Sequence, residues 1–350
     1  MSSSTNIAVN ADVRPPLTKV QGKKPDRHQN VAGEAFWEWT KLRKIALRQI
    51  DKFIDLVPVV LRDEDLTAVN RMRVYCRRLE EILDLIYVKP RPRHIRKLRR
   101  RLKLSRRTLG KLRNCDALLA AADNSIATQR PDSEAWQALR EHLQAVRAQT
   151  AAKTLEKLGR VNLSVPYLRL KRDFAQGPDD SANNGHGNRS EMHPEVAVIY
   201  MRIVRSLEKH WREFTDAVEE SHHDPCEHVI HGMRIAAKKL RYLAEVMNKL
   251  HIAGTIDALN WLKTLQRTIG IWHDLEIMER ALSEVVRGKA FHADAVVAGQ
   301  VDHVIRHNRE VKKASTKRFF QMTRHSRDYQ LIKHWVSGVL AMHGAQINRH

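Results

Sequence analysis

Two segments of the chain repeat one another, and this repeat limits the fold more than any other feature of the sequence. Residues 69–74 read Val-Asn-Arg-Met-Arg-Val, and residues 230–235 read Ile-His-Gly-Met-Arg-Ile. Both copies then continue into a basic pair and a leucine, at residues 77–79 and 238–240. Because similar segments build similar units, the repeat predicts two related halves that face each other. Residues that the two copies share are candidates for function.

The repeat extends into the segments on both sides of these copies. Basic residues recur at an offset of 161 positions before the copies and of 160 positions after them. The first half supplies Lys41, Lys44, Arg48, Lys103 and Arg107, and the second half supplies Arg202, Arg205, Lys209, Lys263 and Arg267. Each half therefore has three consecutive segments with matching basic positions.

Apolar residues recur at helical spacing almost throughout the chain, as at Met72, Cys76 and Leu79. This periodicity predicts an all-α protein, with four helices in each half packed as antiparallel bundles. Turn-forming and polar residues mark a tail and a linker that have little to bury. We expect a disordered N-terminal tail at 1–30, a first helical half at 31–172, a linker at 173–193 and a second helical half at 194–345.

The composition is strongly basic. Lys and Arg number 62 against 40 Asp and Glu, a net charge of +22 that favours a polyanionic partner. The three cysteines are far apart, as expected in a reducing compartment without a disulfide framework. We find neither a signal-peptide core nor an apolar run of the roughly 20 residues that a membrane helix needs. The sequence thus predicts a soluble, cytoplasmic protein with no membrane partner.

The second copy places basic residues on one face of a helix. His231, Arg234, Lys238 and Arg241 follow one another at steps of three, four and three. A solvated surface stripe is the simpler interpretation, but such stripes normally mix charges because like charges repel at these spacings. The first copy keeps a basic stripe, with Asn70 in place of the histidine and Glu80 in place of the last arginine. Its basic members are Arg73, Arg77 and Arg78. A stripe kept in both copies indicates an anionic ligand.

A long segment without acidic residues lies between the two copies. Residues 85–115 contain thirteen Lys and Arg residues, including Arg113, and no Asp or Glu. Their leucines still follow a helical seam, which favours a packed helix over a nuclear-localisation signal or a disordered basic arm. Arginine forks hold phosphate oxygens in pairs, so this helix is expected to present a wide phosphate-binding surface.

Two groups of residues could suggest other chemistry. His273 and Asp274 could form an acid/base pair, but no nucleophile or third partner has a matching spacing, which favours an orienting carboxylate. Residues 222–231 are rich in histidine and contain Cys226, yet the spacing fits no familiar zinc finger. We therefore expect a loop and helix start there, with no metal, no cofactor and no catalytic residues.

The chain resembles the CHAD domain family, the conserved histidine alpha-helical domain. Residues 231–242, His-Gly-Met-Arg-Ile-Ala-Ala-Lys-Lys-Leu-Arg-Tyr, are similar to the family signature His-x-x-Arg-x-x-x-Lys-Lys/Arg-Leu-Arg. Residues 109–116 resemble its Leu-Gly-x-x-Arg-Asp segment, and the duplicated layout extends from about 31 to 344. Asn70 and Asn114 depart from the pattern, where a histidine and an aspartate are usual.

The resemblance implies two four-helix bundles related by a pseudo-twofold axis, with a basic groove that binds inorganic polyphosphate. It also implies association with cytoplasmic polyphosphate granules and their proteins. The Glu-x-Glu-x-Lys motif of the triphosphatase domains fused to some members is absent, so no hydrolytic activity is expected. The alternatives are nonspecific nucleic-acid binding and a phosphate-processing enzyme. The residues expected to bind polyphosphate are Lys41, Lys44, Arg48, Arg73, Arg77, Arg78, Lys103, Arg107, Arg113, Arg202, Arg205, Lys209, His231, Arg234, Lys238, Lys239, Arg241, Lys263, Arg267 and His273.

Overall fold

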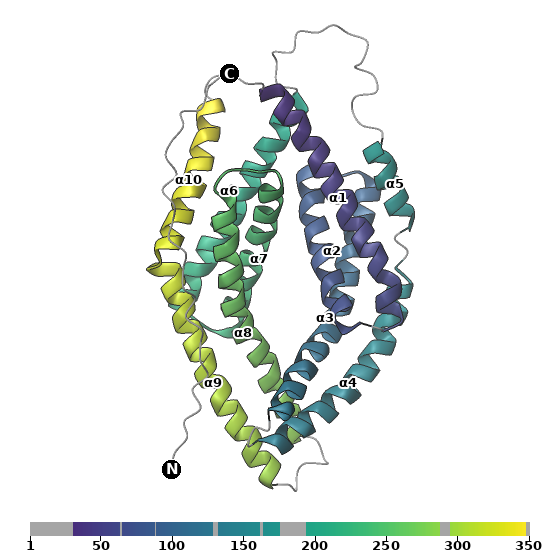
Figure 1. Cartoon of the computed structure of the whole chain (residues 1–350), viewed down its shortest axis with the longest axis vertical. Helices are drawn as coiled ribbons and strands as arrows, with labels where there is room; N and C mark the ends of the chain where they lie inside the picture. Colours follow the sequence, from purple (N-terminus) through teal and green to yellow (C-terminus); the bar gives the residue numbers. More distant parts are fainter. Residues whose placement is uncertain are drawn as a thin grey trace.

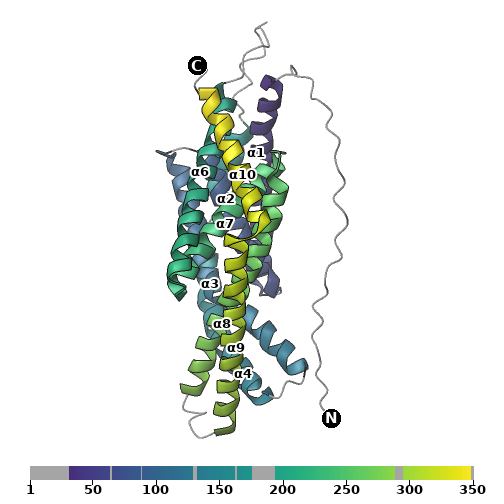
Figure 2. The same ribbon diagram turned by 90° about the vertical axis from the view of Figure 1, so that its left-hand side faces the viewer.

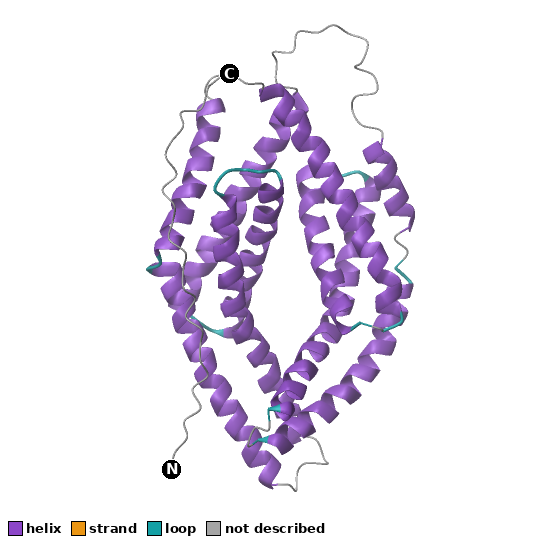
Figure 3. Cartoon of the chain, viewed as in Figure 1, coloured by secondary structure: helices purple, strands orange, loops and turns teal. Residues whose placement is uncertain are grey.

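The computed structural model describes residues 31–63, 65–87, 89–128, 132–161, 164–175, 194–287 and 295–347. These residues form an all-α fold (Figure 3). The helices are α1 (Val31–Leu61), α2 (Leu66–Ile86), α3 (Arg93–Ala127), α4 (Ser133–Gly159), α5 (Ser164–Ala175), α6 (Pro194–His223), α7 (Glu227–Lys249), α8 (Thr255–Arg287), α9 (Ala295–Arg324) and α10 (Arg327–Ile347). The tail at 1–30 and the linker from 176 onward lie outside the described residues.

Each half has five described helices instead of the four that the sequence predicts. In the first half α4 packs on α1 and α3, and α5 then packs on the same two helices, so together they take the fourth position of the bundle. In the second half α9 packs on α8, and α10 packs on α6 and α8, so these two helices share that position. Local signals explain the breaks: α4 ends at Gly159, and the Ser326 hydroxyl accepts a hydrogen bond from the Tyr329 amide (3.0 Å) as an N-cap of α10. Residues 173–175, expected in the linker, form the end of α5.

The predicted apolar seams of α2 and α7 face the core. Met72, Cys76 and Leu79 are fully buried, as are Met233 and Ala237. Burial of such side chains stabilises the fold by about 1.5–3 kcal/mol each, so the apolar seam holds the basic face of each helix in a fixed direction. Within the described ranges, no helix has an apolar stretch long enough to cross a membrane.

The two halves meet at several places along the molecule. Helices α1–α5 and α6–α10 form two groups that converge at the lower end of Figure 1, where α3 and α4 meet α8 and α9. A separate apolar cluster that includes Leu119, Leu139, Leu282 and Val301 fills this junction. Nearer the centre, α2 contacts α7 and α3 contacts α8. The basic faces of the repeated helices are thereby brought to one place.

A partly buried ion-pair cluster connects the turn between α1 and α2 to α3 and α4. Arg147 donates to both carboxylate oxygens of Asp63 (2.6 and 2.7 Å) and to Asp116 (2.7 Å), which is 7% exposed. Replacing Arg147 by Met would leave two carboxylates without their cation, so the free energy of unfolding should fall by about 3 kcal/mol. Urea denaturation followed by circular dichroism measures this change. Arg160→Met, which removes an exposed pair with Glu156, should change it by less than about 1 kcal/mol, and equal losses would contradict the interpretation.

Candidate polyanion-binding site

The basic faces of α2 and α7 border one cavity between the two halves. This central cavity has a volume of about 340 Å³, and its walls come from α2, α3, α7 and α8. Asn70 and Asn114, the two departures from the family pattern, also line it. Its basic lining residues are Arg73, Arg77, Arg107, Lys111, Arg113, His231, Arg234, Lys238 and His273. Five arginines, two lysines and two imidazoles thus converge on a small volume.

Little negative charge balances these cations. Within the described part of the chain, Asp274 is the carboxylate within ion-pair distance of the cavity's basic residues. Arg113 donates to Asp274 (3.3 Å) and to the side-chain oxygen of Asn114 (3.4 Å). His273 Nδ1 lies 3.7 Å from the same carboxylate. Asp274 therefore orients Arg113 and leaves most of the positive charge uncompensated.

The crowded cations shift one another's protonation. Burial, together with Arg234, Arg77, Arg113 and Arg73, lowers the pKa of Lys238 to about 6. Burial and neighbouring arginines lower the pKa of Arg73 to about 10, and burial lowers that of Arg234 to about 10. An anion placed in the cavity would oppose each of these shifts, because it stabilises the charged forms.

Two histidines lie beside this group. The rings of His231 and His273 are 5.6 Å apart between centroids. Partial burial and the nearby cations lower the pKa of His231, and they lower that of His273 to about 4. The buried Nε of Arg234 and Nδ1 of His273 have no hydrogen-bond partner among the described residues. Both imidazoles are thus neutral near pH 7, and the cavity has donor capacity that an oxyanion can use.

Gly110 makes room for Arg73. The Arg73 guanidinium donates to the Arg106 carbonyl (2.6 Å), and a Cβ on Gly110 would lie 3.0 Å from Arg73 Nη1. Gly110→Ala should therefore displace Arg73 and weaken polyanion binding by about fivefold, the value of roughly one hydrogen bond. Isothermal titration calorimetry measures the loss. Gly270→Ala, at the corresponding place in α8 with no atom within 4 Å, should leave affinity unchanged; an equal effect of both variants would contradict this role.

Some predicted binding residues are held outside the cavity by ion pairs. Arg78 and Arg241 both donate to Glu245 (2.7 Å each), which links α2 to α7. Lys239 pairs with Glu213 (2.8 Å), and Lys209 lies 3.9 Å from the same residue. Arg78 and Lys239 therefore connect two helices, whereas Arg241 and Lys209 each lie near a carboxylate of their own helix.

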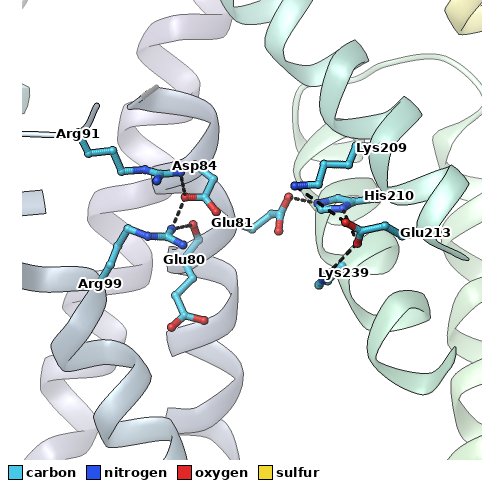
Figure 4. Close-up of polar contacts among 9 residues, drawn as sticks. All are labelled: Glu80, Glu81, Asp84, Arg91, Arg99, Lys209, His210, Glu213 and Lys239. Carbon is cyan, nitrogen blue, oxygen red and sulfur yellow. Dashed lines mark hydrogen bonds and ion pairs between the residues drawn. The ribbon is translucent and has the colours of Figure 1, made fainter. Parts of the chain in front are cut away.

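Figure 4 shows that the pairs around Glu213 belong to a bridge between the halves. Glu81 of α2 points across to His210 of α6, with 2.9 Å between Oε1 and Nε2. His210 in turn lies 3.7 Å from Glu213. On the other side of α2, Arg91 and Arg99 pair with Asp84. In addition, Arg202 of α6 donates hydrogen bonds to the Leu85 and Ile86 carbonyls. Together with the bridge, these bonds hold α6 against the C-terminal end of α2.

The other predicted residues lie on outer surfaces. Lys41 lies on α1 and is partly buried. The exposed residues are Lys44, Arg48, Lys103, Arg205, Lys263 and Arg267. None of these seven lines the central cavity. Eight of the twenty predicted residues do line it: Arg73, Arg77, Arg107, Arg113, His231, Arg234, Lys238 and His273.

The structure adds lining residues that sequence reasoning did not select. Lys111 lies one helical turn after Arg107, and this i,i+4 spacing could have indicated it. Tyr242 is 5% exposed at the inner wall and lies at the end of the signature segment. The Arg241 guanidinium lies over the Tyr242 ring, with its Cζ 4.6 Å from the ring centroid. Tyr242 thus lies against both the cavity and the Arg241 guanidinium.

The histidine-rich segment 222–231 is spread over different surroundings. His222 accepts or donates a hydrogen bond with the Thr323 hydroxyl (3.0 Å), and its ring lies 4.4 Å from that of Phe320. Cys226 Sγ lies 3.0 Å from His228 Nδ1, whereas His231 faces the central cavity. Among the described residues, no group of three or more potential metal ligands comes together.

Comparisons with known proteins agree with this architecture. A CHAD domain family model matches residues 44–283. The crystal structure of the CHAD domain from the plant Ricinus communis has a TM-score of 0.55 and 21% identity, covering 88% of this chain and 99% of that one. PptA from Streptomyces chartreusis has a TM-score of 0.56 and 14% identity, covering 81% and 97%. None of the curated proteins compared with the chain matches it. With a family model that matches most of its length, and with this fold, the chain belongs to the CHAD domain family.

Proposed function

We propose that the protein binds inorganic polyphosphate in the central cavity without transforming it. The observation that carries this proposal is the convergence of nine basic residues from four helices, with Asp274 as the carboxylate beside them. Arginine guanidinium groups bind phosphate oxygens in pairs, and five of the nine residues are arginines. Membership of the CHAD family supports the same ligand class.

The shape and lining of the cavity favour a thin, inorganic polyanion. A polyphosphate chain has a negative charge on each unit and no bulky substituents, so a short segment can contact cations from both halves at once. Single-stranded nucleic acid usually relies on aromatic side chains that stack with bases. In the central cavity the aromatic residue is Tyr242, which is almost fully buried. Nucleic acid is therefore the second candidate for this site.

The surroundings of the cavity favour binding over catalysis. Phosphoryl-transfer enzymes hold Mg²⁺ with acidic residues and position a nucleophile in line with the phosphate. Among the described residues, the carboxylate within ion-pair distance of the cavity's basic residues is Asp274, and it pairs with Arg113. Incubation of the protein with polyphosphate and Mg²⁺ should leave the chain length unchanged on a gel, and shortening would contradict the noncatalytic proposal.

A competition experiment tests the ligand. Labelled polyphosphate is bound at physiological salt and challenged with unlabelled polyphosphate, single-stranded DNA and RNA at equal phosphate concentration. We expect polyphosphate to displace the label at concentrations at least tenfold lower than either nucleic acid. Affinity should also fall linearly with salt on a logarithmic plot, because binding releases counterions. Equal displacement by all three polymers would contradict a polyphosphate-specific site.

Polyphosphate binding would place the protein at cytoplasmic polyphosphate granules. A fluorescent fusion of the full chain should colocalise with stained granules in cells that accumulate polyphosphate. The same fusion with Arg234→Glu and Lys238→Glu should become diffuse, because both residues line the central cavity. Granule association of the double variant at the wild-type level would mean that another surface or a partner protein provides the targeting.

A further inference from the structure

A second basic surface runs along the outer side of the second half. On α9, Arg306, Arg309, Lys313, Lys317 and Arg324 follow one another at steps of three, four, four and seven, which places them on one helical face. All five are exposed, and we call them the α9 cationic face. At 1.5 Å per residue the face extends over about 27 Å. In Figure 2 α9 runs down the side of the molecule that faces the viewer.

This face borders two adjoining hollows. One, of about 680 Å³, is lined by Arg309, Lys313, Lys317 and Arg324 together with two aromatic residues, Trp272 and Phe320. The other, of about 560 Å³, shares Arg309 and Lys313 with the first and adds Arg306. Together they form an open groove whose cations continue beyond its aromatic part.

The groove has positive charge to offer a ligand. Arg309, Lys317 and Arg324 form no ion pair within the described residues, while Lys313 pairs with Glu310 where both side chains are at least 70% exposed. Such exposed pairs contribute little, so a phosphate can replace the carboxylate. Beneath them Lys312 is held by Glu276 and Glu279 (2.8 Å each). Its ammonium lies 5.7 Å from the Trp272 ring centroid, and it fixes that side chain at the edge of the groove.

The α9 cationic face is particular to the second half. At the corresponding places, counted from the pair Arg147 and Arg309, α4 has Gln144, Ala151 and Leu155 where α9 has Arg306, Lys313 and Lys317. Arg147 itself is occupied by Asp63 and Asp116. The repeated architecture therefore does not require the basic face.

We propose that the α9 cationic face is a second site, which binds single-stranded nucleic acid. Phosphates would follow the cations along α9, and one or two bases would stack on Trp272 and Phe320. The aromatic residues decide the ligand class: they give an inorganic phosphate chain no added contact, whereas stacking is worth about 1–3 kcal/mol per base. The length of the face matches site sizes of four or more nucleotides on other single-strand-binding surfaces. The groove shares no lining residue with the central cavity, and a third cavity lies against both, lined by Trp272 of the groove and by His231, Arg234 and His273 of the central cavity.

A pair of variants separates the two sites. A labelled 12-nucleotide oligouridylate is titrated by fluorescence anisotropy into the full-length protein at fixed salt. Lys313→Glu with Lys317→Glu should weaken its binding by at least tenfold and leave polyphosphate affinity in calorimetry within about threefold. Arg234→Glu with Lys238→Glu should do the reverse. The matched control, Arg318→Glu on another face of α9 with Lys333→Glu on α10, changes the net charge equally and should have little effect on oligonucleotide binding.

Stacking is tested separately, because Phe320 also packs against the core. Phe320→Leu keeps an apolar side chain and should lower oligonucleotide affinity by about tenfold. The wild-type protein should bind an abasic oligonucleotide with the same number of phosphates about tenfold more weakly than it binds the oligouridylate. Loss of oligonucleotide binding in the central-cavity variant alone, or an equal loss in the Arg318 and Lys333 control, would overturn the proposal.

Discussion

Replacing Arg234 and Lys238 together by glutamate should weaken polyphosphate binding by about 100-fold or more at physiological salt. Both side chains line the central cavity, and both are partly buried. A hydrogen bond to a charged group contributes about 1.5–3 kcal/mol, so the loss of two such contacts alone corresponds to this factor. The new carboxylates would also repel the ligand. Isothermal titration calorimetry measures the affinity, and circular dichroism verifies that the helical fold is retained.

The control for this variant changes two other basic residues that the sequence also predicts to bind polyphosphate. Lys263→Glu with Arg267→Glu makes the same change in net charge, but both residues are exposed on α8 outside the cavity. We expect a loss of threefold or less, because exposed charges at a distance are screened by salt. Equal losses in the two double variants would mean that the protein binds polyphosphate through its general charge, without a specific cavity.

Replacing Lys238 by Met should stabilise the free protein and weaken its binding. The pKa of Lys238 is about 6 in the fold, lowered first by burial, against 10.5 for an unperturbed lysine. Between these values the unfolded chain holds a proton that the folded chain releases, so this lysine lowers the free energy of unfolding, and the penalty is largest below pH 6. Lys238→Met removes the penalty and should raise the free energy of unfolding by about 1–2 kcal/mol at pH 6, measured in urea. A destabilised variant would contradict the proposed charge crowding.

The same lysine makes binding dependent on pH. Polyphosphate bound in the cavity would stabilise the ammonium form, so the complex should take up a proton above pH 6, and affinity should fall as the pH rises from 6 to 9. Calorimetry in two buffers of different ionisation enthalpy measures the protons taken up. Lys238→Arg, which stays charged, should bind with a weaker pH dependence over this range. An unchanged pH dependence in that variant would exclude Lys238 as its source.

The sequence predicts most of the fold because its signals are local. The apolar seam through Met72 and Cys76 and its copy through Met233 and Ala237 are fully buried, as their helical spacing indicates. The predicted number of four helices in each half was wrong. The helix breaks near Gly159 and Ser326 depend on single residues inside otherwise helical patterns. A serine or glycine is common within helices too, so neither position signals a break by itself.

The candidate site was less predictable, because partners distant in sequence decide which cations remain available. Lys238 and Lys239 are neighbours in one basic pair, yet Lys238 lines the cavity and Lys239 pairs with Glu213 of α6. Arg241 continues the same helical face but pairs with Glu245, which also holds Arg78 across the two halves. The spacing of basic residues in the sequence predicts which face of a helix they share. How many of them line the cavity depends on the way α2 packs against α7.

Lysine acylation, mapped by mass spectrometry, tests the central cavity most directly. With a pKa of about 6, the Lys238 amine is largely unprotonated at pH 7 and should react with an acylating reagent in the free protein. Bound polyphosphate should protonate and cover it, so its modification should fall at least tenfold, together with that of Lys111. The exposed Lys44 and Lys263 should react equally with and without the ligand. Protection of Lys44 and Lys263 with unchanged reactivity of Lys238 would contradict polyphosphate binding in the cavity.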